Sequence, residues 1–234
     1  MISLGAGQGT KDRHLLIGFG KNGREVTYIP VDSGQTLLEM ACASAEECGV
    51  NHRGLKADIT NPDHLAQLTP KPGDPPRLLL MIGNTLGAFD PPEMLRRLRG
   101  LVREGDLLLV DGELGNDAGT RAGYEHSANR AFAFAPLQSI GIQEQNGTLA
   151  FESIEDVRPG LHRIEKYFRV EADMTLRIGG EPISFQAGEC IRMNHSGKFE
   201  RQAFLTMLTD SRFEPIVELL SEDNRLLMVL AKPR

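Results

Sequence analysis

The sequence contains no tryptophan, few aromatic residues and only three cysteines among its 234 residues. The cysteines are Cys42, Cys48 and Cys190, an odd number without the spacing of a metal site. A small secreted protein stabilised by disulfides would need paired cysteines. We therefore expect reduced thiols, which are typical of a cytoplasmic protein.

Long hydrophobic runs and an excess of basic residues are also missing. The longest apolar runs, such as RLLLMIG and DLLLVDG, are too short to cross a bilayer, and no secretory signal opens the chain. The net charge is −6, whereas a nucleic-acid-binding surface is normally basic. We therefore expect neither a membrane nor a nucleic acid as a partner. Hydrophobic residues make up 40% of the chain, enough for a folded core.

Short apolar segments alternate with helical patterns over the first half of the chain. The segments lack polar alternation, as expected of strands covered on both faces, and read ISLG, VTYIPVD, LKAD, RLLLMIG and DLLLVDG. Between them the patterns predict helices over residues 11–19, 35–47, 62–68 and 91–102. Repeated strand–helix units of this kind predict a parallel sheet with right-handed crossovers.

The pattern changes near Gly115. Residues 115–196 contain three segments with strand-like polar alternation, TLAFESIEDV, LHRIEKYFRVEADMTL and GECIRMNHS. Turn signals such as Gly179-Gly180 separate them, and together they predict an inserted α+β piece. A helix over residues 199–211 and two strands, EPIVELLS and RLLMVLAKP, then complete the sheet, the last strand being antiparallel. We predict a cofactor domain in two parts, residues 1–114 and 197–234, around a substrate domain of residues 115–196.

The first predicted strand runs directly into a glycine-rich loop, ISLGAGQGTKD. Gly5, Gly7 and Gly9 allow positive φ angles and let the backbone approach a ligand, next to the free N–H groups of a helix N-terminus. Lys11 falls in the first turn of that helix, where acidic residues are favoured. Its side chain is therefore a candidate for binding a ligand carboxylate.

Two acidic residues end the next two predicted strands. Asp32 stands where a carboxylate can accept both hydroxyls of a ribose, and Asp58 stands where it can reach an adenine edge. Both lie with the glycine loop at the carboxyl edge of the sheet, where open α/β folds bind ligands. The loop departs from the dinucleotide pattern G-x-G-x-x-G because its third glycine comes one residue early, which disfavours a nicotinamide-dependent oxidoreductase.

A longer stretch, LLLMIGNTLGAFDPPEMLRRLRGLVREGDLLLVDGEL, resembles the histidine Nα-methyltransferase family of ergothioneine biosynthesis, which uses S-adenosylmethionine. The similarity continues in YIPVDSG, GYEHSANRAFAF, HRIEKYF and CIRMNHSGKF, in the same order and over nearly the whole chain. It implies an α/β architecture, a Rossmann-like SAM-dependent methyltransferase fold with an inserted α+β substrate domain.

The resemblance implies that S-adenosylmethionine is the cofactor and that its contacts are kept. Together with Gly9 of the same loop, the predicted cofactor-binding residues are Gly5, Gly7, Lys11, Asp32, Asp58, Ile59 and Thr85. A structural alternative is that Thr85, like Asn84 before it, is simply a turn residue.

On the substrate side the sequence departs from the family it resembles. The family's asparagine in a G-N-F segment falls on Ala88, and its glutamate that reads the imidazole falls on Asn194. An apolar residue of the family falls on Lys166, which could meet a carboxylate if it points inward. These changes predict an acceptor other than histidine, although Lys166 and Asn194 could instead face water. The predicted acceptor-binding residues are Tyr124, Phe134, Lys166, Asn194 and Ser196.

The acceptor-binding residues that match the family also have structural explanations. Tyr124 and Phe134 could pack the core of the insert. Ser196 could cap the following helix, with Lys198 in solvent. No catalytic acid, base or nucleophile and no metal-ligand set stands out in the sequence.

We predict a SAM-dependent methyltransferase that transfers a methyl group in line to the amine of an amino acid or a related small molecule. The alternative is a SAM-binding protein or partner subunit without catalysis. The family has a helical segment before its first strand that contributes tyrosines to the substrate pocket, and this chain has no counterpart. We therefore expect a missing N-terminal segment or a partner to complete the pocket.

Overall fold

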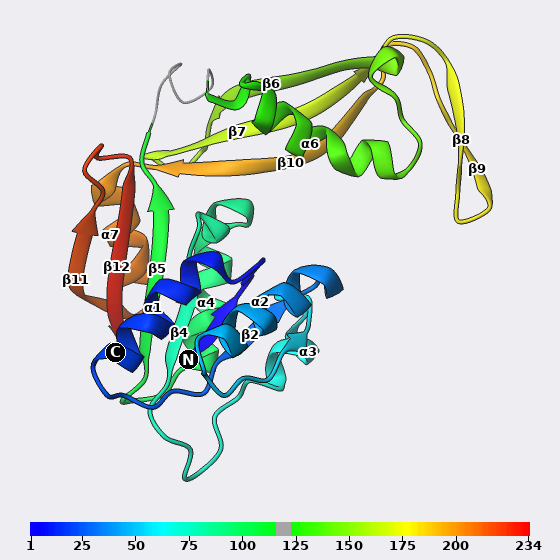
Figure 1. The fold of residues 1–234 in the computed structure, drawn as a ribbon. Coiled ribbons are helices and arrows are strands. Elements are labelled where there is room, and N and C mark those ends of the chain that lie inside the picture. The colour runs from blue at the N-terminus through cyan, green and yellow to red at the C-terminus, as the bar shows by residue number, and fades with distance from the viewer. Residues whose placement is uncertain (116–122) are drawn as a thin grey trace. The chain divides into compact units, whose positions relative to one another are not determined.

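The computed structural model describes residues 1–115 and 123–234. Contacts divide the chain into two compact units. The sheet unit comprises Met1–Leu114 and Arg201–Arg234, and the insert unit comprises Gly115–Glu200. Each unit contains β-structure of its own (Figure 1).

A seven-stranded sheet forms the centre of the sheet unit, in the order β11-β12-β5-β4-β1-β2-β3. The strands β1 to β5 pair in parallel, whereas β12 pairs antiparallel with both β5 and β11. The predicted parallel sheet with an antiparallel last strand is confirmed. The strands are β1 (Ile2–Leu4), β2 (Ile29–Asp32), β3 (Leu55–Lys56), β4 (Leu78–Met81), β5 (Leu107–Glu113), β11 (Phe213–Leu220) and β12 (Leu226–Pro233).

Helices connect these strands and cover both faces of the sheet. From β1 the chain moves to β2 and β3 on one side, and from β4 it moves to β5 on the other. Right-handed crossovers then place the connecting helices on opposite faces. Accordingly α1 packs against α2, while α4 packs against α3 and α7 (Figure 1). The helices are α1 (Thr10–Lys21), α2 (Gln35–Glu47), α3 (Pro62–Ala66), the 3₁₀ turn η1 (Thr85–Ala88), α4 (Pro91–Leu101) and α7 (Arg201–Asp210).

The helix α4 shows how local sequence sets an element. Asp90 caps its N-terminus by accepting a hydrogen bond from the Glu93 N–H at 3.0 Å, and Pro91 occupies the first turn, where no N–H is needed. Leu95 and Leu98 then fall on one face and are fully buried. The cap and the apolar face together explain why the sequence predicts this helix.

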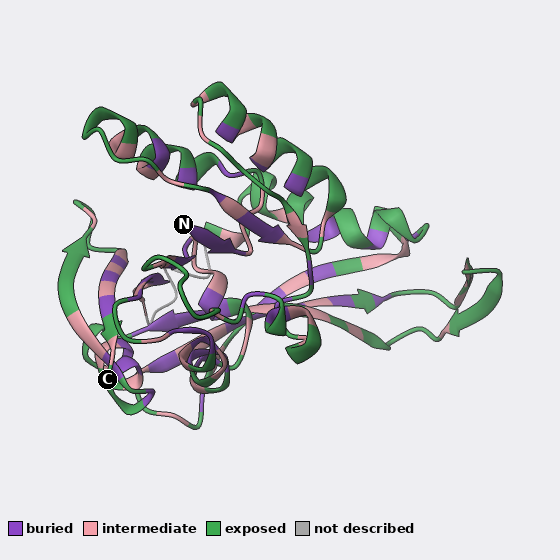
Figure 2. Ribbon diagram, turned by 90° about the horizontal axis from the view of Figure 1, so that it is seen from below, coloured by how far each residue is buried: buried purple, intermediate pink, exposed green. Residues whose placement is uncertain are grey.

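Burial in the sheet unit follows the strands. Figure 2 colours the central strands as buried and the outer helix surfaces as exposed. In β4 and β5, Leu79, Leu80, Leu108 and Val110 are fully buried, as expected of parallel strands with both faces covered. The carboxyl ends of these strands are thereby fixed by the core, and the loops that follow them have a rigid base.

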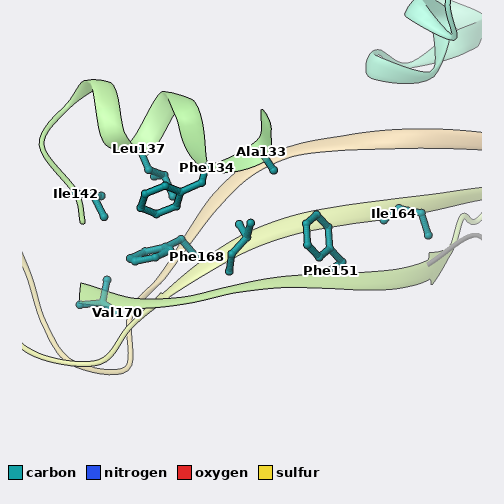
Figure 3. Packing of buried hydrophobic residues seen from close by; sticks show 9 residues of the cluster. Ala133, Phe134, Leu137, Ile142, Phe151, Ile164, Phe168 and Val170 are labelled. Carbon is teal, nitrogen blue, oxygen red and sulfur yellow. The ribbon is translucent and has the colours of Figure 1, made fainter. Parts of the chain in front are cut away.

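A three-stranded antiparallel sheet, in the order β10-β7-β6, forms the centre of the insert unit. The helix α6 lies across one face, and Phe134 on this helix packs on Phe168 of β7 with ring centroids 5.9 Å apart (Figure 3). The elements are α6 (Ser127–Ser139), the 3₁₀ turn η2 (Glu144–Asn146), β6 (Gly147–Glu155), β7 (Leu161–Val170), β8 (Met174–Ile178), β9 (Glu181–Phe185) and β10 (Cys190–Phe199).

Two features of the insert differ in detail from the sequence prediction. The segment 161–176 forms two strands, because β8 pairs only with β9 in a separate hairpin closed at Gly179 and Gly180, both with positive φ. The helix predicted from Phe199 begins at Arg201 instead, because β10 continues its pairing with β7 as far as Phe199. The insert unit therefore ends at Glu200 rather than at Ser196.

Candidate functional site

The loops after β1 and β4 enclose a cavity in the sheet unit. The sheet order reverses between these two strands, and in open α/β sheets ligands bind at that point, outside the carboxyl ends of the strands. The cavity has a volume of about 260 Å³. Its walls come from Ser3, Gly5, Ala6, Gly7, Gln8, Thr10, Lys11, Asp12, Ile82, Gly83 and Thr85.

The loop after β1 is built from backbone contacts that side chains would prevent. Gly5 has a φ of 70°, and a Cβ atom there would lie 2.9 Å from Cγ2 of Thr85. The N–H of Gly5 also donates to the carbonyl of Val31 at 2.9 Å, which ties the loop to the end of β2. The loop therefore approaches both neighbouring strand ends closely and leaves its backbone facing the cavity.

Gly9 has a different position from the other two glycines of the loop. It is buried, and a Cβ atom there would lie 3.0 Å from the Cα of Ala41 in α2. Gly9 is also absent from the residues that line the cavity. Close packing of α1 against α2 accounts for this glycine without a ligand.

Asp32 is held rigidly at the end of β2. One carboxylate oxygen accepts a hydrogen bond from the Gly7 N–H at 2.9 Å, and the other accepts one from the Gly34 N–H at 2.9 Å. A carboxylate has about four lone-pair sites, so each oxygen can accept a further hydrogen bond. A pair of adjacent hydroxyl groups, as in a ribose, matches that capacity.

Asp58 follows β3, one strand further along the same edge. Its side chain is exposed, and Oδ1 accepts hydrogen bonds from both the N–H and the hydroxyl of Thr60 at 2.7 Å. These bonds from Thr60 lower the pKa of the carboxyl below its ordinary value. The neighbouring Ile59 is buried and anchors the segment. Asp58 is thus a charged hydrogen-bond acceptor at a defined position on the carboxyl edge of the sheet.

Two charged side chains, those of Lys11 and Asp12, line the cavity. Nζ of Lys11 lies over Gly83, since a Cβ at that glycine would be 2.3 Å from it. Burial raises the pKa of Asp12, and hydrogen bonds from Tyr28 and Ser3 partly oppose this. The ammonium of Lys11 favours the charged forms of both Asp12 and Asp111, and the Lys11 side chain is itself exposed.

Asp111 is a residue of this region that the sequence reasoning missed. Its carboxylate oxygens accept hydrogen bonds from the N–H groups of Gly83 and Asn84, each at 2.7 Å, and burial raises its pKa. Asn84 has a φ of 57°, so it is indeed a turn residue, and Thr85 bonds back to the carbonyl of Ile82. An acidic residue near the end of a predicted strand was the available signal, as it was for Asp32.

The insert unit holds a second group of polar residues, on the face of its sheet that α6 covers. Lys198 is almost fully buried and donates to the hydroxyl of Tyr124 at 2.8 Å and to that of Ser196 at 3.1 Å. Ser196 lies within β10, so it caps no helix, and Lys198 is not in solvent. Both structural alternatives for this pair are therefore wrong.

Lys166 lies beside the same tyrosine. Its side chain is 7% exposed, so it does not face water, and its Nζ lies 5.4 Å from the centre of the Tyr124 ring. Nζ of Lys198 lies 5.0 Å from the same centre. Burial lowers the pKa of Lys166, and the charge of Lys198 lowers it further. The two lysines and Tyr124 form what we call the lysine–tyrosine group.

The other predicted acceptor residues are placed differently. Phe134 is buried in the core of the insert, against Phe168, as its structural alternative anticipated (Figure 3). Asn194 is exposed on β10, and Ala88 is exposed at the end of η1. Asn194 therefore faces water in the insert unit, while Lys166 does not.

Three further features of the described residues bear on the kind of site. A larger cavity of about 870 Å³ lies at the amino ends of the strands, near Met1, Ile29 and Arg77, away from all the predicted site residues. In the ranges that the structure describes, no group of three or more His, Cys, Asp or Glu side chains could hold a metal ion. Within the same ranges no helix is long and apolar enough to span a membrane.

Comparison with solved structures identifies the fold as that of Rossmann-like, SAM-dependent methyltransferases. A SAM-dependent methyltransferase from Clostridium acetobutylicum ATCC 824 matches with a TM-score of 0.51 and 12% identity, over 99% of this chain and 82% of that one. An O-methyltransferase family protein from Burkholderia thailandensis matches with a TM-score of 0.53 and 12% identity, over 99% of this chain and 50% of that one. At such identities the similarity establishes the fold alone.

The family is established by sequence. The model of the histidine-specific, SAM-dependent methyltransferases matches residues 1–233, and the chain belongs to this family. S-adenosylmethionine is accordingly its cofactor. The N-methyltransferase fsqC of Aspergillus fumigatus is 29% identical over 218 residues, which are 86% of this chain and 57% of that protein. The chain thus spans somewhat more than half the length of this relative.

Proposed function

We propose that this protein transfers the methyl group of S-adenosylmethionine directly to the amine of an amino acid or a related small molecule. Family membership and similarity to an N-methyltransferase support an enzyme over a SAM-binding subunit without catalysis. The observation that carries the proposal is the Asp32 carboxylate, fixed by Gly7 and Gly34 beside a loop that fits the ligand.

The edge of the sheet matches the parts of S-adenosylmethionine in order. In the cavity, Gly5, Gly7 and Thr85 surround the methionine half, and Lys11 binds its carboxylate. At the next strand end Asp32 accepts the ribose hydroxyls. Beyond it, Asp58 and the backbone of Ile59 hold the adenine. Gly9 supports this site by letting α1 pack closely on α2.

The acceptor is assigned to the insert unit. Tyr124, Ser196 and Lys166 supply the polar contacts, and Phe134 supports them from the core. We infer that histidine is not the acceptor, because Asn194 replaces the carboxylate that would pair with a ring N–H. A site that lacks this partner loses its main discrimination in favour of an imidazole.

Little acid–base chemistry is needed for this reaction. Bound S-adenosylmethionine supplies a methyl carbon that its sulfonium already activates. The protein has to hold an uncharged amine in line with that carbon, and positioning of this kind can supply about 7–11 kcal/mol of a barrier. The acceptor's ammonium loses its proton to water before transfer, so the chain needs no dedicated base.

The first test concerns the cofactor. Asp32→Ala is expected to weaken S-adenosylmethionine binding on the order of tenfold to a hundredfold, because charged hydrogen bonds to the ribose are lost. Asp210→Ala is a matched control, since it removes one exposed carboxylate at the end of α7 in the same unit. Calorimetric titration measures both, and unchanged affinity in Asp32→Ala would contradict the proposed site.

The second test concerns catalysis. Incubation with labelled S-adenosylmethionine and a panel of amino acids and amines should give a methylated amine, detected by mass spectrometry. Histidine should be a poorer acceptor than at least one other amino acid. Tight cofactor binding without methylation of any amine would instead favour the non-catalytic subunit.

The three cysteines are free in the structure, and we propose that the protein works in the reducing cytoplasm.

A further inference from the structure

The insert unit buries two positive charges around one aromatic ring. Lys166 and Lys198 are 7% and 1% exposed, and both ammonium groups lie over Tyr124. A buried charge is costly unless it is paired and hydrogen-bonded. A face that keeps two such charges next to an apolar core therefore needs a physical reason.

Lys166 is the less satisfied of the two. Among the residues that the structure describes, no carboxylate or carbonyl accepts a hydrogen bond from its ammonium, and the only charge that shifts its pKa belongs to Lys198, which repels it. Within the described ranges, its contact with the Tyr124 ring is the one favourable interaction of this ammonium. The ammonium of Lys166 thus lacks an anionic partner within the described part of the insert.

The backbone opposite Lys166 is irregular. Tyr167 pairs with Arg192 and Glu165 pairs with His195, so one residue of β7 faces two residues of β10. The single residue is Lys166, and the two are Met193 and Asn194. Such bulges are frequent next to active sites, where they redirect side chains. This irregularity is independent of the charge of Lys166 and is typical of strand pairs beside a binding site.

Two hydroxyl groups lie at the same face of the insert sheet as Lys166. The Tyr124 oxygen accepts from Lys198, and among the described residues no acceptor takes its proton. Ser196 adds a second hydroxyl on the same face. The ammonium of Lys166, whose Nζ lies 5.4 Å from the centre of the Tyr124 ring, and the hydroxyl of that tyrosine are two donors that match the two acceptor oxygens of a carboxylate.

We propose that the methyl acceptor carries a carboxylate that binds the Lys166 ammonium and the Tyr124 hydroxyl. This carboxylate can be the α-carboxylate of an amino acid or an acidic group on its side chain. The inference rests on the proposed function, whose acceptor it defines. It explains why Lys166 occupies a position where an apolar residue would fit the core, since Ile164 and Phe168 occupy the same face of β7.

Binding of matched acids and amides tests the proposal. The probes are glutamate with glutamine and isoglutamine, aspartate with asparagine and isoasparagine, and phenylalanine with phenylalaninamide. They are titrated calorimetrically into the full-length protein saturated with S-adenosylhomocysteine, which has no methyl group to transfer. At least one acid should bind on the order of tenfold or more tightly than its amide. The amide that binds more weakly than its acid shows whether the bound carboxylate is the α-carboxylate or that of the side chain.

Three variants tie the preference to Lys166. Lys166→Met removes the charge at similar size and should abolish the difference between acid and amide. Lys166→Arg keeps the charge and should retain the difference between acid and amide. Arg169→Met is the matched control, because it removes one positive charge from an exposed position of the same strand. Thermal melting of each variant reports whether it is folded.

The outcomes separate this proposal from the proposed function. Equal binding of acids and amides in every set, no binding of any probe, or an acid preference that survives in Lys166→Met would each overturn it. Acid-selective binding that depends on Lys166, without any methyl transfer, would support the carboxylate site and contradict the methyltransferase activity. Failure to bind S-adenosylhomocysteine or S-adenosylmethionine would instead contradict the cofactor site alone.

Discussion

One carboxylate of this protein combines a structural role with the ligand-binding role that we propose for it. Asp32 accepts the N–H groups of Gly7 and Gly34, so the same carboxylate shapes the loop and presents its remaining lone pairs to a ligand. Asp111 has only the first of these tasks, since both oxygens are buried and hold the N–H groups of Gly83 and Asn84. Exposure therefore separates Asp32, which we propose to bind a ligand, from Asp111, whose role is structural.

Lys166 gives a prediction about stability at the same scale. Lys166→Met should raise the free energy of unfolding at neutral pH, on the order of 1 kcal/mol, because a buried ammonium without an anionic partner is replaced by an apolar side chain. Denaturant unfolding measures this difference. A variant less stable than the wild type would show that the cation–π contacts outweigh the burial of the charge.

The pH dependence of that difference follows from the lowered pKa of Lys166. The unfolded state binds the proton more tightly than the folded state, so the charge costs stability below the folded pKa, and this cost fades as the pH rises toward 10.5. The advantage of Lys166→Met should therefore shrink between neutral and alkaline pH. Unfolding series at neutral pH and above pH 9 test this, and a constant advantage would contradict it.

At the scale of elements, packing of α1 on α2 depends on one glycine. Gly9 and Gly23 have similar positive φ angles, 72° and 62°, but only at Gly9 would a Cβ meet a neighbour, at 3.0 Å from Ala41. Gly23→Ala should cost about 1–2 kcal/mol from backbone strain alone. Gly9→Ala should cost more, because the helix must also shift. Denaturant unfolding of both variants isolates the packing contribution, and equal losses would exclude it.

The strand β10 shows an element whose detail the pattern could not specify. Alternating residues predicted a strand over 188–196, and the strand exists, but its bulge and its extension to Phe199 come from pairing with β7. Register between strands distant in sequence is set by tertiary packing. The bulge therefore became visible only once β7 and β10 were paired, and with it the position of Asn194 opposite Lys166.

At the scale of the whole molecule, the sheet unit is stabilised at the edge opposite the cofactor loops. Asp106 is fully buried and pairs with Arg77 at 2.7 Å, and it also accepts from the Arg77 and Arg103 N–H groups. Burial alone would raise the pKa of Asp106, but these hydrogen bonds hold it below its ordinary value. The contacts join the starts of β4 and β5 and thus the centre of the sheet.

Asp106→Asn is expected to destabilise the protein by about 2–3 kcal/mol at neutral pH, because Arg77 loses its charged partner. A carboxyl whose pKa is lowered on folding stabilises the fold above its unfolded pKa and loses this effect as the pH falls through the folded value. The difference in the free energy of unfolding between wild type and variant should therefore be constant near neutrality. It should disappear as the pH falls below about 4. Urea unfolding at both pH values measures it, and a gap that widens in acid would contradict the assignment.

The sequence by itself determined the order of strands and helices in the sheet unit, the place of the insert, and the family. The order of the elements and the place of the insert follow from hydrophobic periodicity, helix caps and glycine positions, which act locally along the chain. The family follows from the resemblance of whole sequence segments and from the family model that matches residues 1–233. It also marked Asp32 and Asp58, because strand ends in a parallel sheet share one edge.

Only the tertiary structure decided which polar residues are buried together. Lys198 was expected in solvent in one interpretation of the sequence, and Asp111 was overlooked, yet both are buried and hydrogen-bonded. Conversely, Asn194 carries the informative substitution but is exposed in the insert unit. The reason is physical, since burial and the pairing of charges arise from contacts between residues far apart in sequence, such as Tyr124 and Lys198, which no local pattern encodes.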